Sequence, residues 1–291
     1  MSDFLELTFE LGSLDSNAAE AAALACGACA VSFVDAHDDP VLEPPPGELR
    51  LWPSTLVKCL FIAQDAAALT AALAAAVPLD PARIAAQHIA DRPWEREWLK
   101  DFHALRFGRR LWVCPRHERV SAADAAVVTL DPGLAFGTGT HASTALCLEW
   151  LDARSPADAR VIDYGCGSGI LGLAALKLGA ARVHAFDIDP QALTATRENA
   201  AANGLAQQLT VHEDAASLPT GVDVLLANIL AAPLCQLAPC FAMLVRPGGE
   251  LVLAGLMQHQ SAEVTAACAA CFDVTPWGYR DGWICLSGRR L

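Results

Sequence analysis

The chain has 291 residues, a length that suggests two domains, and 54% of them are hydrophobic, which excludes a disordered protein. Its 33 acidic and 20 basic residues give a net charge of −13, so bulk electrostatics argue against direct nucleic-acid binding. Residues 1–90 hold 12 acidic and 3 basic residues, a balance that suits a basic partner, although solubility alone also explains it.

The first ninety residues alternate extended and helical patterns. Strands are expected over residues 5–11, 30–34, 48–52, 57–63 and 83–89, helices over 17–24 and 65–76, and a proline-rich turn over 43–47. We interpret this as a β-α-β-β-α-β order, which predicts a small ferredoxin-like α+β domain over residues 1–90. That fold has many functions and by itself indicates none.

Residues 91–120 are interpreted as a linker helix that leads into a strand. Trp94 and Trp98 lie four residues apart, so they share one helical face, and several Arg and Lys residues surround them. The two side chains either pack at the domain junction, which is the commoner case, or form a basic aromatic surface for a partner.

The remaining residues, 121–291, predict a doubly wound α/β domain. Strands are expected over residues 127–130, 160–165, 182–188, 209–214, 222–228 and 250–256, with helices between them, a turn at 246–249 and two closing strands near 272–276 and 282–287. Such alternation indicates a mostly parallel sheet, whose ligands bind at the carboxyl ends of the strands.

Neither a membrane anchor nor a secretion signal is expected. The 22 uncharged residues between Asp223 and Arg246 include Pro233, Pro239 and polar residues, unlike a transmembrane helix. The segment MSDFLELTFE lacks the basic and apolar regions of a signal peptide. We therefore expect a cytoplasmic protein without membrane contact.

The 11 cysteines are scattered, and the sequence predicts no metal site. Two C-x-x-C pairs exist, Cys26 with Cys29 and Cys268 with Cys271, both in alanine-rich segments. A zinc site would require the pairs to meet across two domains, so we interpret these cysteines as small buried hydrophobic residues.

The segment VIDYGCGSGI at residues 161–170 indicates a nucleotide-type ligand. An apolar strand is followed by a turn with Gly165, Gly167 and Gly169, where the backbone can approach a ligand closely. The spacing G-x-G-x-G is one residue shorter than that of a dinucleotide site, and Ile170 stands where a third glycine would be. The spacing favours S-adenosylmethionine.

Acidic residues end the next two strands. Asp187 is placed to accept hydrogen bonds from both ribose hydroxyls, and a charged acceptor makes such bonds strong. Asp189 precedes Pro190 and is expected to cap the following helix. Asp214 either reaches an adenine edge or caps a helix.

Asn228 ends the fourth of these strands and is our candidate for the residue that orients an amine acceptor. The alternative is a buried amide that holds its loop together. Upstream, the segment LDPGLAFGTGTHAST precedes a helix that is expected from Ala142, and it suggests either a lid over the cofactor or helix capping. His141, within this segment, is a candidate catalytic base.

Together these segments resemble the ribosomal protein L11 methyltransferases of bacteria. The resemblance rests on LDPGLAFGTGTH, VIDYGCGSGILGLAALKLGA, FDIDPQAL, ANILAAPL and WEREWLKDFHALRFG, and it runs along nearly the whole chain. It implies a seven-stranded class I methyltransferase domain, joined by a linker to a ferredoxin-like substrate-recognition domain. It also implies methyl transfer from S-adenosylmethionine to the N-terminal α-amine and lysines of ribosomal protein L11.

The resemblance further implies cofactor contacts at Thr144, Gly165, Asp187 and Asn228, and Gly167 joins them as part of the same turn. Catalysis is assigned to Asn228 and His141. The sequence departs from the family at Ala142, where a proline is usual, and in its many cysteines. We expect a monomer.

Other functions remain open from the sequence. The chain could methylate another protein lysine or a small-molecule amine, it could be a nicotinamide-dependent oxidoreductase, or it could bind cofactor without catalysis. The short glycine spacing argues against the oxidoreductase, and the presence of Asn228 together with the whole FGTGTH segment argues against a non-enzymatic scaffold.

Overall fold

The computed structural model describes residues 4–37, 51–62, 65–89, 103–130 and 139–291. The chain divides into two compact units, Met1–Glu97 and Trp98–Leu291. The predicted linker helix with Trp94 and Trp98, the proline-rich turn at 43–47 and most of the glycine-rich segment before Gly139 lie outside the described residues.

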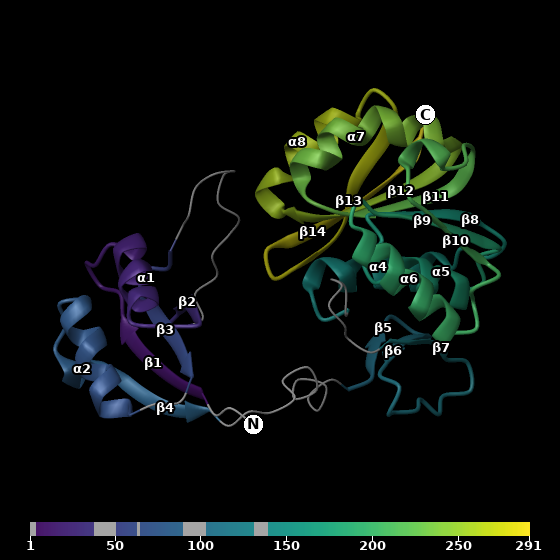
Figure 1. The fold of residues 1–291 in the computed structure, drawn as a ribbon. Coiled ribbons are helices and arrows are strands. Elements are labelled where there is room, and N and C mark those ends of the chain that lie inside the picture. Colours follow the sequence, from purple (N-terminus) through teal and green to yellow (C-terminus); the bar gives the residue numbers. More distant parts are fainter. Residues whose placement is uncertain (1–3, 38–50, 63–64, 90–102, 131–138) are drawn as a thin grey trace. The chain divides into compact units, whose positions relative to one another are not determined.

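The N-terminal unit is a four-stranded antiparallel sheet with the strand order β2-β3-β1-β4. Apolar residues alternate along β1, so Leu5, Leu7 and Phe9 are buried beneath both helices. Of the strand expected over residues 48–52, the structure describes only Leu51 and Trp52. Neither lies in a strand, so this part of the prediction is wrong. The elements are β1 (Phe4–Glu10), α1 (Ser16–Ala25), β2 (Ala30–Asp35), β3 (Thr55–Ile62), α2 (Ala66–Ala76), η1 (Pro81–Arg83) and β4 (Ala85–Ile89) (Figure 1).

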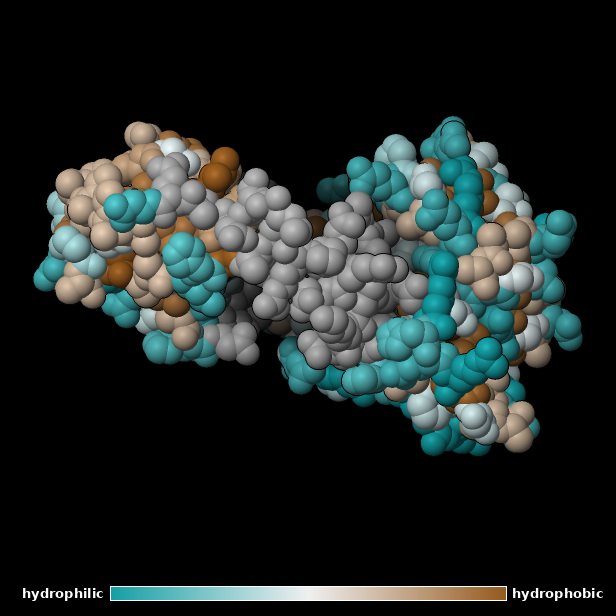
Figure 2. Space-filling model, turned by 60° about the horizontal axis from the view of Figure 1, so that its bottom comes forward, coloured by the Kyte–Doolittle hydropathy of each residue, from teal (hydrophilic) through white to brown (hydrophobic). Residues whose placement is uncertain are grey.

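The two units differ in the polarity of the faces that Figure 2 shows. In Figure 2, apolar residues cover much of the visible face of the N-terminal unit, whereas hydrophilic residues predominate on the visible face of the C-terminal unit. The exposed large side chains of the N-terminal unit include Leu24 and Ile62, which are 49% and 54% exposed.

The C-terminal unit contains a seven-stranded sheet with the order β10-β9-β8-β11-β12-β14-β13. Five strands run parallel and β14 runs antiparallel to both of its neighbours, β12 and β13. The strands are β8 (Arg160–Tyr164), β9 (Arg182–Phe186), β10 (Leu209–His212), β11 (Val222–Asn228), β12 (Val245–Met257), β13 (Phe272–Arg280) and β14 (Trp283–Arg290). This α/β architecture with a mixed sheet is the one that the sequence predicts.

Helices cover both faces of the sheet, which leaves only its edges open for a ligand. The helices α4 (Ala142–Arg154), α5 (Ile170–Lys177) and α6 (Pro190–Ala202) contribute to the core on one face, and α7 (Ala231–Leu244) and α8 (Ser261–Cys268) to the core on the other (Figure 1). β8 lies between β9 and β11, so the chain order reverses beside β8, the position where doubly wound sheets bind ligands.

Two local predictions are correct, but the pairing around them differs from the expectation. The strand expected at 127–130 is present as β7 (Ala126–Thr129), but it belongs to a separate three-stranded sheet with β5 (Leu105–Phe107) and β6 (Leu111–Cys114). The turn expected at 246–249 is an interruption within β12, because the pairing with β11 passes from Val222 with Val245 directly to Val224 with Glu250. Local periodicity does not report such pairing between distant segments.

The small sheet is fastened to α4 by a buried carboxylate. Asp152 is 4% exposed, and it accepts hydrogen bonds from the backbone N–H groups of Arg110 and Leu111, each at 3.0 Å.

Among the described residues, no helix is long and apolar enough to cross a bilayer.

Candidate functional site

The glycine turn after β8 has the backbone conformation that only glycine adopts readily. Gly165, Gly167 and Gly169 have φ angles of 76°, 54° and 80°. A Cβ atom on Gly165 would lie 2.4 Å from Cγ2 of Ile229, so a side chain does not fit there. The turn therefore presents bare backbone at the carboxyl end of the sheet.

Helix α6 holds this turn from behind. The hydroxyl of Thr196 donates to the carbonyl oxygen of Gly167 at 3.0 Å, and the side-chain amide of Asn199 donates to that of Ser168 at 2.9 Å. Neither residue is predicted from the sequence. Their signal is faint, since it consists of two polar residues three positions apart on one helix face.

Asp187 lies against the same turn. One carboxylate oxygen accepts the N–H of Gly167 at 2.9 Å, and the other accepts the N–H of Asp189 at 3.0 Å. Each carboxylate oxygen has two lone pairs, so one on each remains for a ligand. Asp189 caps α6 by accepting from the N–H of Gln191, as predicted.

Asp214 caps a helix, which is one of the two roles predicted for it; the other is contact with an adenine edge. Its side chain accepts the N–H of Ala216 at 2.9 Å and caps the short helix η3 (Ala215–Ser217). The residue does not line the cavity described below.

The side chain of Asn228 is held by a residue 84 positions away. Its Nδ2 donates to the hydroxyl of Thr144 at 3.1 Å. Thr144 is only 1% exposed, in the first turn of α4, so it fixes the Asn228 amide from inside the protein. With the amide nitrogen engaged, the carbonyl oxygen of Asn228 is its acceptor for a ligand.

His141 caps α4. Its Nδ1 accepts the N–H of Ser143 at 3.3 Å, and its ring makes an edge contact with Trp283, with the centroids 4.5 Å apart. Burial lowers the pKa of the imidazole, so the neutral form is favoured. A neutral imidazole can accept a proton, as a catalytic base must. His141 also caps α4, which is the other role that the sequence suggests for this segment.

These elements enclose a cavity of about 510 Å³ at the carboxyl ends of β8, β9 and β11. Gly165, Gly167, Asp187 and Asn228 line it, whereas Thr144 and His141 do not. The other walls are mainly apolar, and Ile188 and Leu230 are exposed by 90% and 52%. Four of the six predicted site residues therefore meet at one cavity.

Asp163 is a buried carboxyl group that the sequence analysis did not assign. It is 1% exposed, one of its oxygens accepts the N–H of Gly172 at 2.8 Å, and the other has no partner among the described residues. Burial raises the pKa of Asp163 to about 7, and the nearby Asp187 carboxylate adds to the rise.

Replacing Asp163 by asparagine is expected to remove a pH dependence of stability. The folded state binds the proton of Asp163 more tightly than the unfolded state, so ionisation of this group costs stability as pH rises from about 4 to 7, by up to about 4 kcal/mol. The stability of Asp163→Asn relative to wild type should therefore rise over this range and level off above it. Urea unfolding at a series of pH values measures the difference.

The matched control is Asp273→Asn, which alters an exposed carboxylate on β13. Its stability relative to wild type should not follow the same rise. If the stability of Asp163→Asn relative to wild type does not change between pH 4 and 7, ionisation of the Asp163 carboxyl group costs the folded state little free energy.

The cysteines form no metal cluster within the described part of the chain, where no three His, Cys, Asp or Glu residues are grouped as ligands. Cys268 is buried, as expected, but Cys29 is exposed, so its interpretation as a buried residue is wrong. Cys29 directly precedes β2, and its N–H donates to the carbonyl oxygen of Leu60 at 2.7 Å.

Comparison with known proteins identifies the family. The family model described as ribosomal protein L11 methyltransferase matches residues 3–291. The chain belongs to this family. It is therefore a methyltransferase, as the resemblance in sequence implies, and the cavity at the carboxyl edge of its sheet is the candidate for the active site.

Relatives in the family are similar over most of their length. The ribosomal protein L11 methyltransferase of Pseudomonas aeruginosa (strain LESB58) is 50% identical over 273 residues, 93% of each chain. That of Methylococcus capsulatus is 50% identical over 267 residues, 91% of each chain. The crystal structure of the ribosomal protein L11 methylase of Lactobacillus delbrueckii subsp. bulgaricus is 32% identical, with a TM-score of 0.60, and covers 65% of this chain and 99% of its own.

Proposed function

We propose that the chain transfers methyl groups from S-adenosylmethionine to the N-terminal α-amine and lysine side chains of ribosomal protein L11. One observation carries the proposal. This chain belongs to the family of ribosomal protein L11 methyltransferases, and its Gly165, Asp187 and Asn228 line one cavity. A ribosomal protein as substrate also implies a cytoplasmic enzyme.

Three features of the cavity fit S-adenosylmethionine. The turn at Gly165 and Gly167 lets the ligand approach the backbone, and a side chain at Gly165 would displace Ile229, another residue that lines the cavity. Asp187 keeps one lone pair on each oxygen for the two ribose hydroxyls. Ile188 and Leu230 offer apolar surface to the adenine. When bound, this cofactor supplies a methyl group activated by a positively charged sulfur.

The acceptor must be a neutral amine, and this favours the α-amine. Near pH 7, deprotonating a lysine with a pKa of about 10.4 costs about 4–5 kcal/mol, whereas an α-amine with a pKa of about 7.8 costs about 1 kcal/mol. Apolar walls lower the pKa of an amine that enters the cavity. No strong base is then required, and His141 is a secondary candidate for accepting the proton.

The role of Asn228 is to orient the acceptor. Its amide is fixed by Thr144, which leaves the carbonyl oxygen to accept a hydrogen bond from the incoming amine. Alignment of the reacting atoms is the main contribution that such a site makes to the rate. In this proposal Thr144 acts through Asn228 and positions it.

We assign substrate recognition to the N-terminal unit. Its sheet order and element order are those of a ferredoxin-like domain, and residues 1–90 carry an acidic excess that complements a basic substrate. The proposed divisions are residues 1–90 for recognition, 91–120 for the linker and 121–291 for methyl transfer. We propose that the enzyme acts as a monomer and makes no direct contact with nucleic acid.

Replacing Asp187 by alanine is expected to weaken the binding of S-adenosylmethionine about 10- to 150-fold. The change removes a charged acceptor from the ribose, and each such bond contributes roughly 1.5–3 kcal/mol. It also releases the N–H of Gly167 and so loosens the turn. Calorimetric titration of the folded variant measures the dissociation constant.

Asp189→Ala provides a matched control, since it removes a carboxylate two residues away that caps α6. Asp189→Ala should lower the free energy of unfolding by about 1 kcal/mol and leave the affinity for the cofactor unchanged. Unchanged affinity in Asp187→Ala would mean that the ribose is held elsewhere.

The proposal itself is tested by identifying the acceptor. The enzyme is incubated with methyl-labelled S-adenosylmethionine and an extract of cells that lack their own L11 methyltransferase, and labelled proteins are identified by mass spectrometry. We expect label on L11, at its α-amine and lysines. Label on another protein alone, or on none, would refute L11 as the substrate.

A further inference from the structure

A second cavity lies at the opposite edge of the seven-stranded sheet. It has a volume of about 400 Å³ and is lined where β11 and β12 begin and β14 ends, and by the loop between α4 and β8. The methyl-transfer cavity is lined where β8, β9 and β11 end. The two cavities therefore share no lining residue, and the second takes no part in the proposed reaction.

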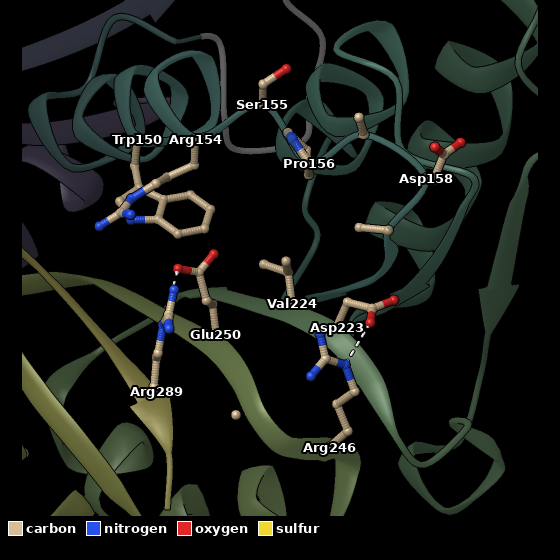
Figure 3. A pocket seen from close by; sticks show the side chains of 13 residues that line it. Trp150, Arg154, Ser155, Pro156, Asp158, Asp223, Val224, Arg246, Glu250 and Arg289 are labelled. Carbon is tan, nitrogen blue, oxygen red and sulfur yellow. Dashed lines mark hydrogen bonds and ion pairs between the residues drawn. The ribbon is translucent and has the colours of Figure 1, made fainter.

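Three arginines and three acidic residues line this second cavity, but they are unevenly distributed. Arg246 and Asp223 form a tight ion pair at 2.7 Å and neutralise each other. In Figure 3, Arg154 and Arg289 lie at one end of the cavity together with Glu250, whereas Asp158 lies at the other. With two guanidinium groups and one carboxylate, the end with Arg154 and Arg289 carries a net positive charge.

The two arginines at this end have spare hydrogen-bonding capacity. Among the described residues, the guanidinium of Arg154 makes no hydrogen bond or ion pair, and it lies over the ring of Trp277, 5.9 Å from the centroid. That contact holds the guanidinium in place without using its N–H groups. Arg289 approaches Glu250 at only 3.9 Å, beyond hydrogen-bonding distance.

Two further observations indicate a ligand at this cavity. Trp150, which lines the same end, is 1% exposed, and its indole N–H is buried without an acceptor among the described residues. A buried donor normally has a partner. In the adjoining loop, Asp158 has a φ angle of 58°, whereas the positive φ of Ser155 belongs to the C-cap of α4. Residues other than glycine with positive φ away from a helix end cluster at ligand sites.

We propose that this second cavity is a binding site for a phosphate group, held by Arg154 and Arg289. A phosphate carries more than one negative charge and at least three acceptor oxygens, enough to bond two guanidinium groups and still offer an oxygen to the Trp150 end. A carboxylate has only two oxygens. Glu250 opposes an anion here, which limits the affinity and provides a test.

The edge around the cavity is basic, in contrast to the chain as a whole with its net charge of −13. Further arginines stand at the same edge, at the start of β8 and β9 and the end of β14: Arg160, Arg182 and Arg290. A phosphate could belong to a free nucleotide, which agrees with the proposed absence of nucleic-acid contact, or to an RNA backbone, which would overturn that part of the proposed function. Both sources present the same chemistry to Arg154.

The test is a calorimetric titration of the full chain with inorganic phosphate at low ionic strength. Arg154→Gln and Arg289→Gln should each weaken binding about tenfold, because each removes a charged donor. Glu250→Gln should strengthen it about threefold, because it removes the opposing charge. Arg83→Gln, an exposed arginine of the N-terminal unit paired with Glu10 at 3.7 Å, should leave it unchanged.

The site is located by nuclear magnetic resonance. Of the indole N–H signals from the 7 tryptophans, the one that is lost in Trp150→Phe should shift on phosphate titration of the wild-type chain. If Trp150→Phe does not fold, the three cavity variants above still decide the question. Affinity for S-adenosylmethionine should be unchanged in all of them.

Saturable phosphate binding with this pattern of gain and loss supports the site. No binding, or equal binding by all four variants, would overturn it. Titration with a single-stranded RNA dodecamer distinguishes the two sources. If the RNA competes with phosphate for the site and binds more weakly to Arg154→Gln, the ligand is an RNA backbone. If the RNA does not compete with phosphate, the ligand is a free phosphate compound. RNA binding at these arginines without any phosphate binding would overturn the single-phosphate site.

Discussion

A shortened protein that begins near Asp91 is expected to bind S-adenosylmethionine with unchanged affinity and to lose methylation of intact L11 by about 10²–10⁴-fold. Each residue that lines the methyl-transfer cavity lies in the C-terminal unit. The first ninety residues hold a net charge of −9 and none of these lining residues. Docking of a basic substrate on them would supply the effective concentration that the cavity otherwise lacks.

The comparison is made with full-length and shortened protein side by side, with initial rates on purified L11 and calorimetry with the cofactor. A short peptide that copies the L11 N-terminus is the internal control, and the two proteins should methylate it at equal rates. Equal rates on intact L11 would contradict the separation of recognition and catalysis. Loss of cofactor binding would show that the units are not independent.

Replacing Asn228 by alanine should lower the rate of methyl transfer about 100-fold, with a much smaller effect on cofactor affinity. A group that aligns the amine acts mainly in the transition state, and displacement by about 1 Å can cost about 100-fold in rate. The fixed amide of Asn228, bonded to Thr144 at 3.1 Å, is the positioned group in this cavity. Single-turnover kinetics at saturating S-adenosylmethionine measure the step.

Gln236→Ala is the control for this prediction, because Gln236 is another amide that lines the cavity and is exposed. It should retain most of the rate. Thr144→Val removes the acceptor that fixes Asn228 and should lower the rate by a smaller factor than Asn228→Ala. A normal methyl-transfer step in Asn228→Ala would exclude this residue from the catalytic role.

The sequence predicts those parts of the fold and site that depend on neighbours along the chain. The glycine turn and Asp187 follow directly after buried strands, so their place at one edge of the sheet follows from strand direction alone. Asp189 precedes Pro190 at the start of α6, and its capping role is likewise local. The resemblance to a known family added the expected cofactor contacts at Thr144 and Asn228, of which only Asn228 lines the cavity.

What the sequence does not predict depends on contacts between distant segments. The pairing of β7 with β6, and not with the large sheet, is decided by partners outside its own pattern. The bond between Asn228 and Thr144 spans 84 positions, and that between Asp152 and the N–H of Leu111 spans 41. The second cavity combines residues of α4, β11, β12 and β14, which no local motif connects.

The cavity lined by Gly165, Asp187 and Asn228 is the proposed methyl-transfer site, and a crystal structure of the full chain with S-adenosylhomocysteine, the product of the reaction, would decide this. We expect the ribose hydroxyls on the carboxylate of Asp187, the chain of the ligand along the turn at Gly165, and its sulfur on the side of Asn228. A ligand bound at any other position, with this cavity empty, would exclude the cavity as the methyl-transfer site.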